Sequence, residues 1–244
     1  MQLRPQSREW LEWVLITSIP LRRFNAENVP VGIASGTLID YGERRFLLSV
    51  RHAVDRGADG WVVDLGYEPG KGTAIYRPRS FNYVAEMVRG SGALREIDFC
   101  YTEVARDLVS TYQNVTPHGI SNECPRHVFQ PDLTAVPDPN GIFAFSGQVK
   151  PELHGSDALA TEMNVYPGLR YLRTESEFHV FELPIAHPGH EHFRGCSGAP
   201  IVDMNKQVVA LVCSGDPETN TIQGVSLARY KFAFDFLCNQ QSAT

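Results

Sequence analysis

The chain reads RGCSGAP over residues 194–200, and a run of apolar residues typical of a strand follows at once. Ser197 is set among glycines, which permit a tight turn that a side chain would obstruct. Gly195 lets the backbone bend so that its own amide and that of Ser197 can point at one place. A carbonyl oxygen that gains negative charge during acyl transfer would be stabilised there. The stretch therefore predicts Ser197 as a nucleophile, with the amides of Gly195 and Ser197 as an oxyanion hole.

A serine nucleophile needs a base, and the base needs a group that orients it. The base candidate is His52, which follows closely on the apolar run FLLSV. The orienting candidate is Asp98, within the segment EIDFCY. A lone carboxylate in an apolar run is costly to bury unless it is hydrogen-bonded, and an imidazole N–H can supply that bond. Asp64, within VVDL, is an alternative orienting residue, although it lies close to His52 along the chain.

The three candidates occur in the order His, Asp, Ser, which is the chain order of chymotrypsin-like enzymes and not that of subtilisin-like or α/β-hydrolase enzymes. Over about residues 31–238 the chain resembles the trypsin/chymotrypsin-like serine peptidases. The matching segments are SGTLI (35–39), LSVRHAV (48–54), IDF (97–99), GCSGAPIV (195–202) and VALVCSG (209–215). The resemblance implies two six-stranded antiparallel β-barrels, with His52, Asp98 and Ser197 as a catalytic triad in the cleft between them.

Short apolar segments separated by turn signals indicate an all-β fold. We expect an N-terminal helical extension at 1–27, a first barrel at 28–115, and a second barrel with a C-terminal helix at 116–244. Helical spacing of apolar residues predicts the two helices at about 8–18 and 228–239. The expected strands are 33–41, 45–50, 60–65, 73–76, 82–88 and 97–104, then 142–148, 170–174, 179–183, 200–203, 208–213 and 224–227.

Composition limits the possible partners and the compartment. The net charge of −6 over 244 residues, without a block of like charges, disfavours a nucleic-acid partner. No run approaches the roughly 20 apolar residues of a membrane span, and the N-terminus lacks the apolar core of a signal peptide. The five cysteines show no CxxC spacing and are interpreted as reduced thiols. We therefore expect a cytoplasmic protein with neither a nucleic-acid nor a membrane partner.

The resemblance also implies a pocket for the side chain that precedes the cut bond. Its residues would be Glu191, His192, Cys213, Ser214, Gly215 and Gly224. The two glycines are expected to leave the pocket open to a long side chain. Glu191, six residues before Ser197, is expected to favour a basic residue by charge pairing. A loop shift of one residue would instead bring His190 or His192 into that position.

The segment AHPGHEH at 186–192 contains three histidines and a glutamate, which zinc can use as ligands. Its Pro-Gly pair indicates a loop, and the loop precedes the nucleophile. We interpret His187, His190 and His192 as pocket-rim or exposed residues, and we expect neither a metal nor another cofactor.

Cys196 is an alternative nucleophile, because related viral enzymes use cysteine. It lies one position before Ser197 and would point away from the base, so we interpret it as a small residue that fills the turn. Secreted relatives carry an acidic residue at this position, which pairs with a new N-terminus after cleavage. Cys196 carries no such charge, so that activation switch is not expected to operate. The oxyanion turn would then be either preformed or set by a partner.

These observations predict a serine endopeptidase that cuts protein or peptide substrates through an acyl-enzyme. The chain resembles bacterial intracellular trypsin-like domains, some of which belong to stress or anti-phage systems, and a requirement for an activating partner protein stays open. Two alternatives also remain. One is a catalytically silent, protease-like binding or scaffold module. The other is an esterase or a self-processing protease.

Overall fold

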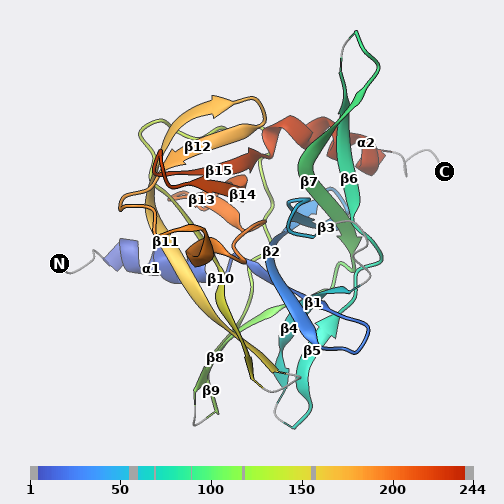
Figure 1. The fold of residues 1–244 in the computed structure, drawn as a ribbon, viewed down its shortest axis with the longest axis vertical. Helices are drawn as coiled ribbons and strands as arrows, with labels where there is room; N and C mark the ends of the chain where they lie inside the picture. The colour runs from blue at the N-terminus through green and yellow to red at the C-terminus, as the bar shows by residue number, and fades with distance from the viewer. Residues whose placement is uncertain are drawn as a thin grey trace.

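A computed structural model of the protein describes residues 5–54, 60–68, 70–88, 90–116, 119–154 and 158–239. The chain forms two antiparallel β units that lie side by side, with a helix near each end of the sequence (Figure 1). We call the first unit the N-terminal sheet and the second the C-terminal barrel.

The N-terminal sheet comprises β1 (Ile19–Phe24), β2 (Pro30–Tyr41), β3 (Arg44–Ser49), β4 (Trp61–Glu68), β5 (Gly72–Tyr76), β6 (Asn82–Met87) and β7 (Leu94–Val104). These seven strands lie in the order β5-β4-β1-β2-β3-β7-β6. The closed six-stranded barrel predicted for this unit is therefore not confirmed. Among the residues that the structure describes, the outermost strands β5 and β6 do not pair with each other.

The additional strand is β1, which lies in the segment expected to be a helical extension. It pairs with both β2 and β4, and its Ile19 and Leu21 side chains are buried. Arg22 of β1 forms an ion pair with Asp64 of β4, with Nε 2.7 Å from Oδ2. The sequence IPLRRF does not by itself indicate a strand, because the charge of Arg22 is paired with Asp64, a residue of a distant segment.

The C-terminal barrel comprises β10 (Phe143–His154), β11 (Ala158–Glu175), β12 (Phe178–Glu182), β13 (Pro200–Asp203), β14 (Val208–Asp216) and β15 (Thr221–Ser226). The six strands close in the order β10-β11-β12-β15-β14-β13, which confirms the barrel predicted for this half. Phe143, Phe145 and Phe181 are fully buried in its core. In the sequence between the two units, β8 (Thr111–Thr116) and β9 (Gly119–Pro125) form a separate hairpin.

Each of the two α-helices packs on the β unit that is farther from it in the sequence. The N-terminal helix α1 (Pro5–Leu15) packs on the C-terminal barrel, where the Trp10 indole N–H donates to the carbonyl of Asp203 at 2.9 Å. The C-terminal helix α2 (Lys231–Asn239) packs against β3 and β7, where it buries Phe234 with its ring 5.2 Å from that of Phe46 and 5.7 Å from that of Tyr101. Two short 3₁₀ helices, η1 (His190–Phe193) and η2 (Ala228–Tyr230), complete the fold. None of the helices in the described residues is long and apolar enough to cross a membrane.

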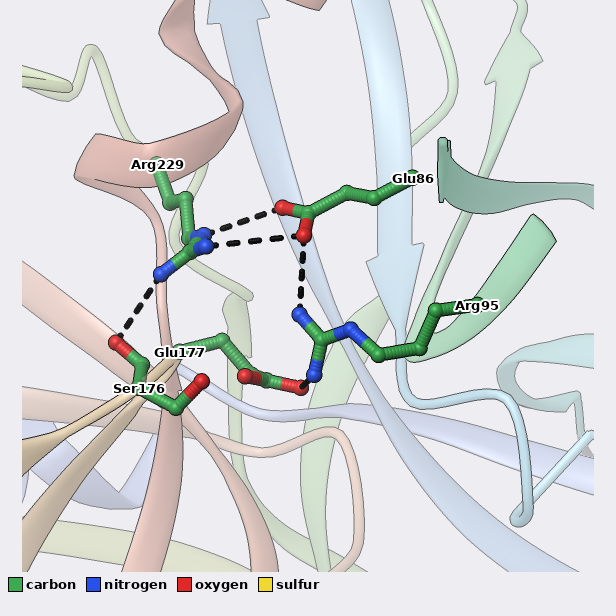
Figure 2. Close-up of polar contacts among 5 residues, drawn as sticks. All are labelled: Glu86, Arg95, Ser176, Glu177 and Arg229. Carbon is green, nitrogen blue, oxygen red and sulfur yellow. Dashed lines mark hydrogen bonds and ion pairs between the residues drawn. The ribbon is translucent and has the colours of Figure 1, made fainter. Parts of the chain in front are cut away.

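A cluster of four alternating charges also joins the two units (Figure 2). Arg95 of β7 pairs with Glu86 of β6 at 2.8 Å and with Glu177, in the turn between β11 and β12, at 2.7 Å. Arg229 of η2 pairs with Glu86 at 3.0 Å and donates to the carbonyl of Ser176 at 3.1 Å. The side chain of Glu177 is only 6% exposed, so its charge depends on Arg95. The cluster therefore links the β6–β7 hairpin to the C-terminal barrel.

Candidate active site

The fold brings His52, Asp98 and Ser197 together. His52 lies in the turn after β3, Asp98 lies on β7, and Ser197 lies in the loop between η1 and β13. His52 Nδ1 is 2.6 Å from Asp98 Oδ2, and His52 Nε2 is 3.1 Å from Ser197 Oγ. The N-terminal sheet thus supplies the imidazole and the carboxylate, and the C-terminal barrel supplies the hydroxyl. Residues that are 145 positions apart in the sequence meet at hydrogen-bonding distance.

Asp98 is held as a carboxylate by several donors. Its Oδ1 accepts from the backbone N–H of His52 at 2.8 Å, and its Oδ2 lies close to the His52 ring and accepts from the thiol of Cys213 at 2.8 Å. Burial raises the pKa of Asp98, but the hydrogen bonds from His52 and Cys213 outweigh it, so the pKa lies below its ordinary value. A carboxylate at Nδ1 places the ring proton there and leaves Nε2 free to accept the Ser197 proton.

The alternative orienting residue lies elsewhere. Asp64 is bound by Arg22 at 2.7 Å, and its Oδ1 accepts from the backbone N–H of Gly66 at 3.0 Å. Its carboxylate is therefore occupied in the strand pair β1–β4, while Asp98 is the carboxylate that contacts His52.

The loop before Ser197 forms a type II turn. Arg194 has φ −59° and ψ 118°, Gly195 has φ 99°, and the N–H of Cys196 donates to the carbonyl of Phe193 at 2.9 Å. The third position of such a turn requires a positive φ, and a Cβ on Gly195 would lie 2.4 Å from the carbonyl oxygen of Gln148. Within the part of the chain that is described, neither Gly195 nor Ser197 donates its N–H to a backbone carbonyl. Both amides are thus available for an incoming oxyanion.

Cys196 is turned into the C-terminal barrel. It is fully buried and packs so closely on Gly147 that a Cβ there would lie 2.7 Å from its sulfur. Burial raises the pKa of the Cys196 thiol, which disfavours the reactive thiolate. The buried position of Cys196 and the raised pKa of its thiol both favour Ser197 as the nucleophile.

A cavity of about 360 Å³ opens beside the Ser197 hydroxyl. Its lining residues are His52, His190, Glu191, Phe193, Arg194, Ser197, Val212, Cys213, Ser214, Gly215 and Ile222. Four of the pocket residues expected from the sequence are therefore brought together, namely Glu191, Cys213, Ser214 and Gly215. His192 and Gly224 are not among them, whereas Phe193, Arg194 and Ile222 line the cavity without having been predicted.

The two glycines do not hold the pocket open as expected. A Cβ on Gly224 would meet Ile201 and Ala210, because this residue lies inside the barrel. A Cβ on Gly215 would lie 2.5 Å from His187 Nε2 and 3.1 Å from Ile222 Cδ1. At both positions, neighbouring side-chain atoms approach the glycine backbone closely. The space near Gly215 is already filled by His187 and Ile222.

The remaining pocket candidates lie on η1. The Glu191 side chain is 85% exposed, and its carboxylate is 3.6 Å from the guanidinium of Arg194. His192 is exposed, and its carbonyl accepts from the Tyr166 hydroxyl at 2.7 Å. Glu191 is therefore a rim residue of the cavity rather than a charge at its base.

The histidine-rich loop does not assemble metal ligands. His187 Nδ1 accepts from the backbone N–H of Gly189 at 3.0 Å, and its ring packs against Phe193. Over the described ranges, the one group of three or more ligand atoms within reach of a common ion is His52, Asp98 and Cys213, in which His52 and Cys213 both hydrogen-bond to Asp98.

The comparisons with known proteins address the fold. No family model and no curated protein matches the sequence. The structure is similar to that of a serine endoprotease from Yersinia pestis, with TM-score 0.56 and 10% identity over 97% of this chain and 68% of that chain. It is also similar to human heparin binding protein, with TM-score 0.58 and 11% identity over 98% and 96%. A third similar structure is the inactive form of the Rv3671c protease, with TM-score 0.50 and 13% identity over 96% of each chain.

At identities this low, the structural similarity establishes the fold alone, and the activity has to be inferred from the residues of the site. The predicted resemblance to trypsin-like serine proteases is thus matched in three dimensions, across almost the whole chain. One of these neighbours is named for binding rather than for catalysis, so the fold by itself does not decide function. The protein has a chymotrypsin-like fold.

Proposed function

We propose that this protein is a serine endopeptidase that uses Ser197, His52 and Asp98. The observation that carries the proposal is the chain of contacts from Asp98 Oδ2 to His52 Nδ1 at 2.6 Å, and from His52 Nε2 to Ser197 Oγ at 3.1 Å. A serine hydroxyl becomes a nucleophile when a neutral imidazole can take its proton, and a carboxylate stabilises the imidazolium that results.

In the proposed reaction, Ser197 Oγ bonds to the carbonyl carbon of the scissile peptide while its proton passes to His52 Nε2. The carbonyl oxygen becomes an oxyanion and accepts hydrogen bonds from the amides of Gly195 and Ser197. One such donor contributes about 3–4 kcal/mol to transition-state stabilisation in comparable sites. His52 then protonates the leaving amine, and a water molecule, deprotonated by His52, releases the acyl group from Ser197. The scheme requires no cofactor.

We also propose a modest preference for Arg or Lys before the cut bond, because Glu191 lines the cavity beside Ser197. Its exposure and its pairing with Arg194 reduce its effect, since solvent screens an exposed charge. A peptide library tests this preference. Wild type should favour basic residues over their neutral isosteres, Glu191→Gln should remove that selectivity, and a library without any basic preference would refute the assignment.

The activity itself is tested with a fluorophosphonate probe and with peptide substrates. Wild type should be labelled on Ser197 and should release new amino termini, whereas Ser197→Ala and His52→Ala should do neither. Absence of labelling would instead support a silent binding module. Labelling with turnover of esters but not peptides would support an esterase, and a single cut in the protein's own chain would support self-processing.

We also propose that the enzyme works in a reducing compartment. All five cysteines are free thiols, and a reducing compartment such as the cytoplasm keeps cysteines in that state. The substrate would be a protein or peptide that can extend along the cleft. An activating partner would be revealed by a lysate fraction that raises the labelling rate of Ser197.

A further inference from the structure

Strand β2 of the N-terminal sheet reaches across the cleft and binds the loop that carries Ser197. The Ser35 hydroxyl donates to the carbonyl of Gly195 at 2.8 Å, and the Ser35 N–H donates to the carbonyl of Ser197 at 2.9 Å. Ser35 is fully buried, and its own carbonyl accepts from the Ser49 hydroxyl at 2.8 Å. A single residue of the N-terminal sheet thus contacts the loop on both sides of Cys196.

These bonds constrain the peptide group that joins Gly195 to Cys196. Its carbonyl is held by Ser35, and its N–H is held by the carbonyl of Phe193, which closes the type II turn. With both ends of this peptide plane bound, the α-carbon of Gly195 has a defined position. Its N–H direction then follows from the positive φ of 99°. The Ser35 hydroxyl therefore acts on the turn that presents one of the two candidate oxyanion donors.

The groups that hold the turn in place are all neutral. The residue between the two bound carbonyls is Cys196, which is buried without a charged partner among the described residues. Hydroxyl and amide donors do not titrate near neutral pH. The shape of the turn consequently depends on a buried serine of the opposite unit and not on the formation of an ion pair.

We propose that Ser35 is a positioning residue that holds the oxyanion turn in its productive shape before substrate arrives. The inference rests on the proposed function, since it assigns the turn to oxyanion binding. It implies that activity needs no charged group to order the turn. Removal of the hydroxyl would leave the carbonyl of Gly195 buried and unpaired, which favours rearrangement of the loop.

The test compares Ser35→Ala with Thr37→Val. Thr37 lies two residues further along β2, is equally buried, and donates its hydroxyl to the carbonyl of Gly198 at 3.1 Å. That carbonyl lies beyond the turn, and the N–H of Gly198 donates to Val212. Both variants lose one buried hydroxyl bond to the same loop, but only Ser35→Ala releases the turn. Ser35→Cys, which keeps a weaker donor, serves as a second variant if Ser35→Ala does not fold.

Two measurements are made on each variant. The first is kcat and KM on a peptide, together with the rate of fluorophosphonate labelling. Ser35→Ala should lower kcat and the labelling rate by about tenfold or more with little change in KM, since partial loss of an oxyanion donor acts on the transition state. The second is hydrogen exchange of the Cys196 amide, which donates to Phe193 in the closed turn. It should accelerate in Ser35→Ala and not in Thr37→Val.

The two proposals fail in different ways. If wild type is not labelled at all, the proposed function fails, and the exchange rates alone still decide whether Ser35 holds the turn. The inference is overturned if Ser35→Ala retains wild-type labelling and Cys196 protection. It is also overturned if Thr37→Val produces the same losses, because the hydroxyl would then support the loop only in a general way.

Discussion

Cys213 donates its thiol hydrogen to Asp98 Oδ2 across 2.8 Å, the same oxygen that lies 2.6 Å from the His52 ring nitrogen. Burial raises the pKa of the Cys213 thiol, and the charge of Asp98 raises it further, so the thiol stays protonated and remains a donor. The sequence placed Cys213 only in the pocket wall. In the structure it both lines the cavity and supports the carboxylate behind the imidazole.

The first prediction concerns this thiol. Cys213→Ala should lower kcat/KM by about threefold to tenfold, because one hydrogen bond to Asp98 of about 1 kcal/mol is lost. Cys213→Ser should retain or raise activity, since a hydroxyl is a better donor in the same place. Steady-state kinetics of the two variants checks this expectation. Equal losses in both would mean that Asp98 gains nothing from a donor at this position.

A second prediction concerns the dependence on pH. The pKa of Asp98 is lower in the folded protein than its ordinary value of 3.8. The carboxylate therefore contributes stability that is complete well above pH 3.8 and is lost as the pH falls through its folded value. Unfolding in urea at a series of pH values should show this loss for wild type. Asp98→Asn should flatten that acid limb and also lower kcat by about 10⁴, because the amide favours the wrong imidazole tautomer.

A third prediction tests the turn at Gly195. Gly195→Ala should lower kcat by about 10²–10³, the cost of losing an oxyanion donor. The new Cβ would lie 2.4 Å from the carbonyl of Gln148 and would face a φ of 99°, so the turn cannot keep its shape. Gly90→Ala is a matched control, because Gly90 has a φ of 88° and no atom within 4 Å of an added Cβ. Comparable activity of the Gly195 and Gly90 variants would contradict the assignment of this turn.

A fourth prediction concerns the charge cluster between the units. Arg95→Met should reduce the free energy of unfolding more than Arg229→Met does, because it leaves the buried Glu177 carboxylate without its guanidinium partner. After Arg229→Met, Glu86 would still be paired with Arg95. Urea denaturation gives the ranking. Adding Glu177→Gln to Arg95→Met should recover part of the loss, and a double-mutant cycle without coupling would contradict the proposed pairing.

Some features of the fold could be predicted because the residue pattern of a single segment specifies them. The continuous apolar runs of β13 and β14 each specify a strand that is buried on both faces, and the C-terminal barrel forms as expected. The first unit was predicted less well. Strand β1 reads IPLRRF, in which Arg22 pairs with Asp64 on a strand about 40 residues away. A local pattern cannot show such a partner.

The pocket illustrates the same limit. Whether a glycine opens a cavity or allows close packing depends on which atoms face it. Cross-strand pairing places Gly224 opposite Val212 inside the barrel, whereas Ile222, two residues earlier, reaches the cavity. The helical turn η1 similarly directs Glu191 to the rim, where Arg194 pairs with it. The residue spacing of a family motif carries no information about these contacts.

The sequence alone identified Ser197, His52 and Asp98 as candidates, because the chemistry of a nucleophile, a base and an orienting acid leaves recognisable residues beside short apolar strands. Tertiary structure decided which carboxylate contacts the imidazole, since only the packing of β7 against β3 brings Asp98 to His52 while Arg22 engages Asp64. It also decided how the loop of Ser197 is held. The bonds from Ser35 and the thiol of Cys213 join segments more than a hundred residues apart, and such contacts exist only once both β units have folded against each other.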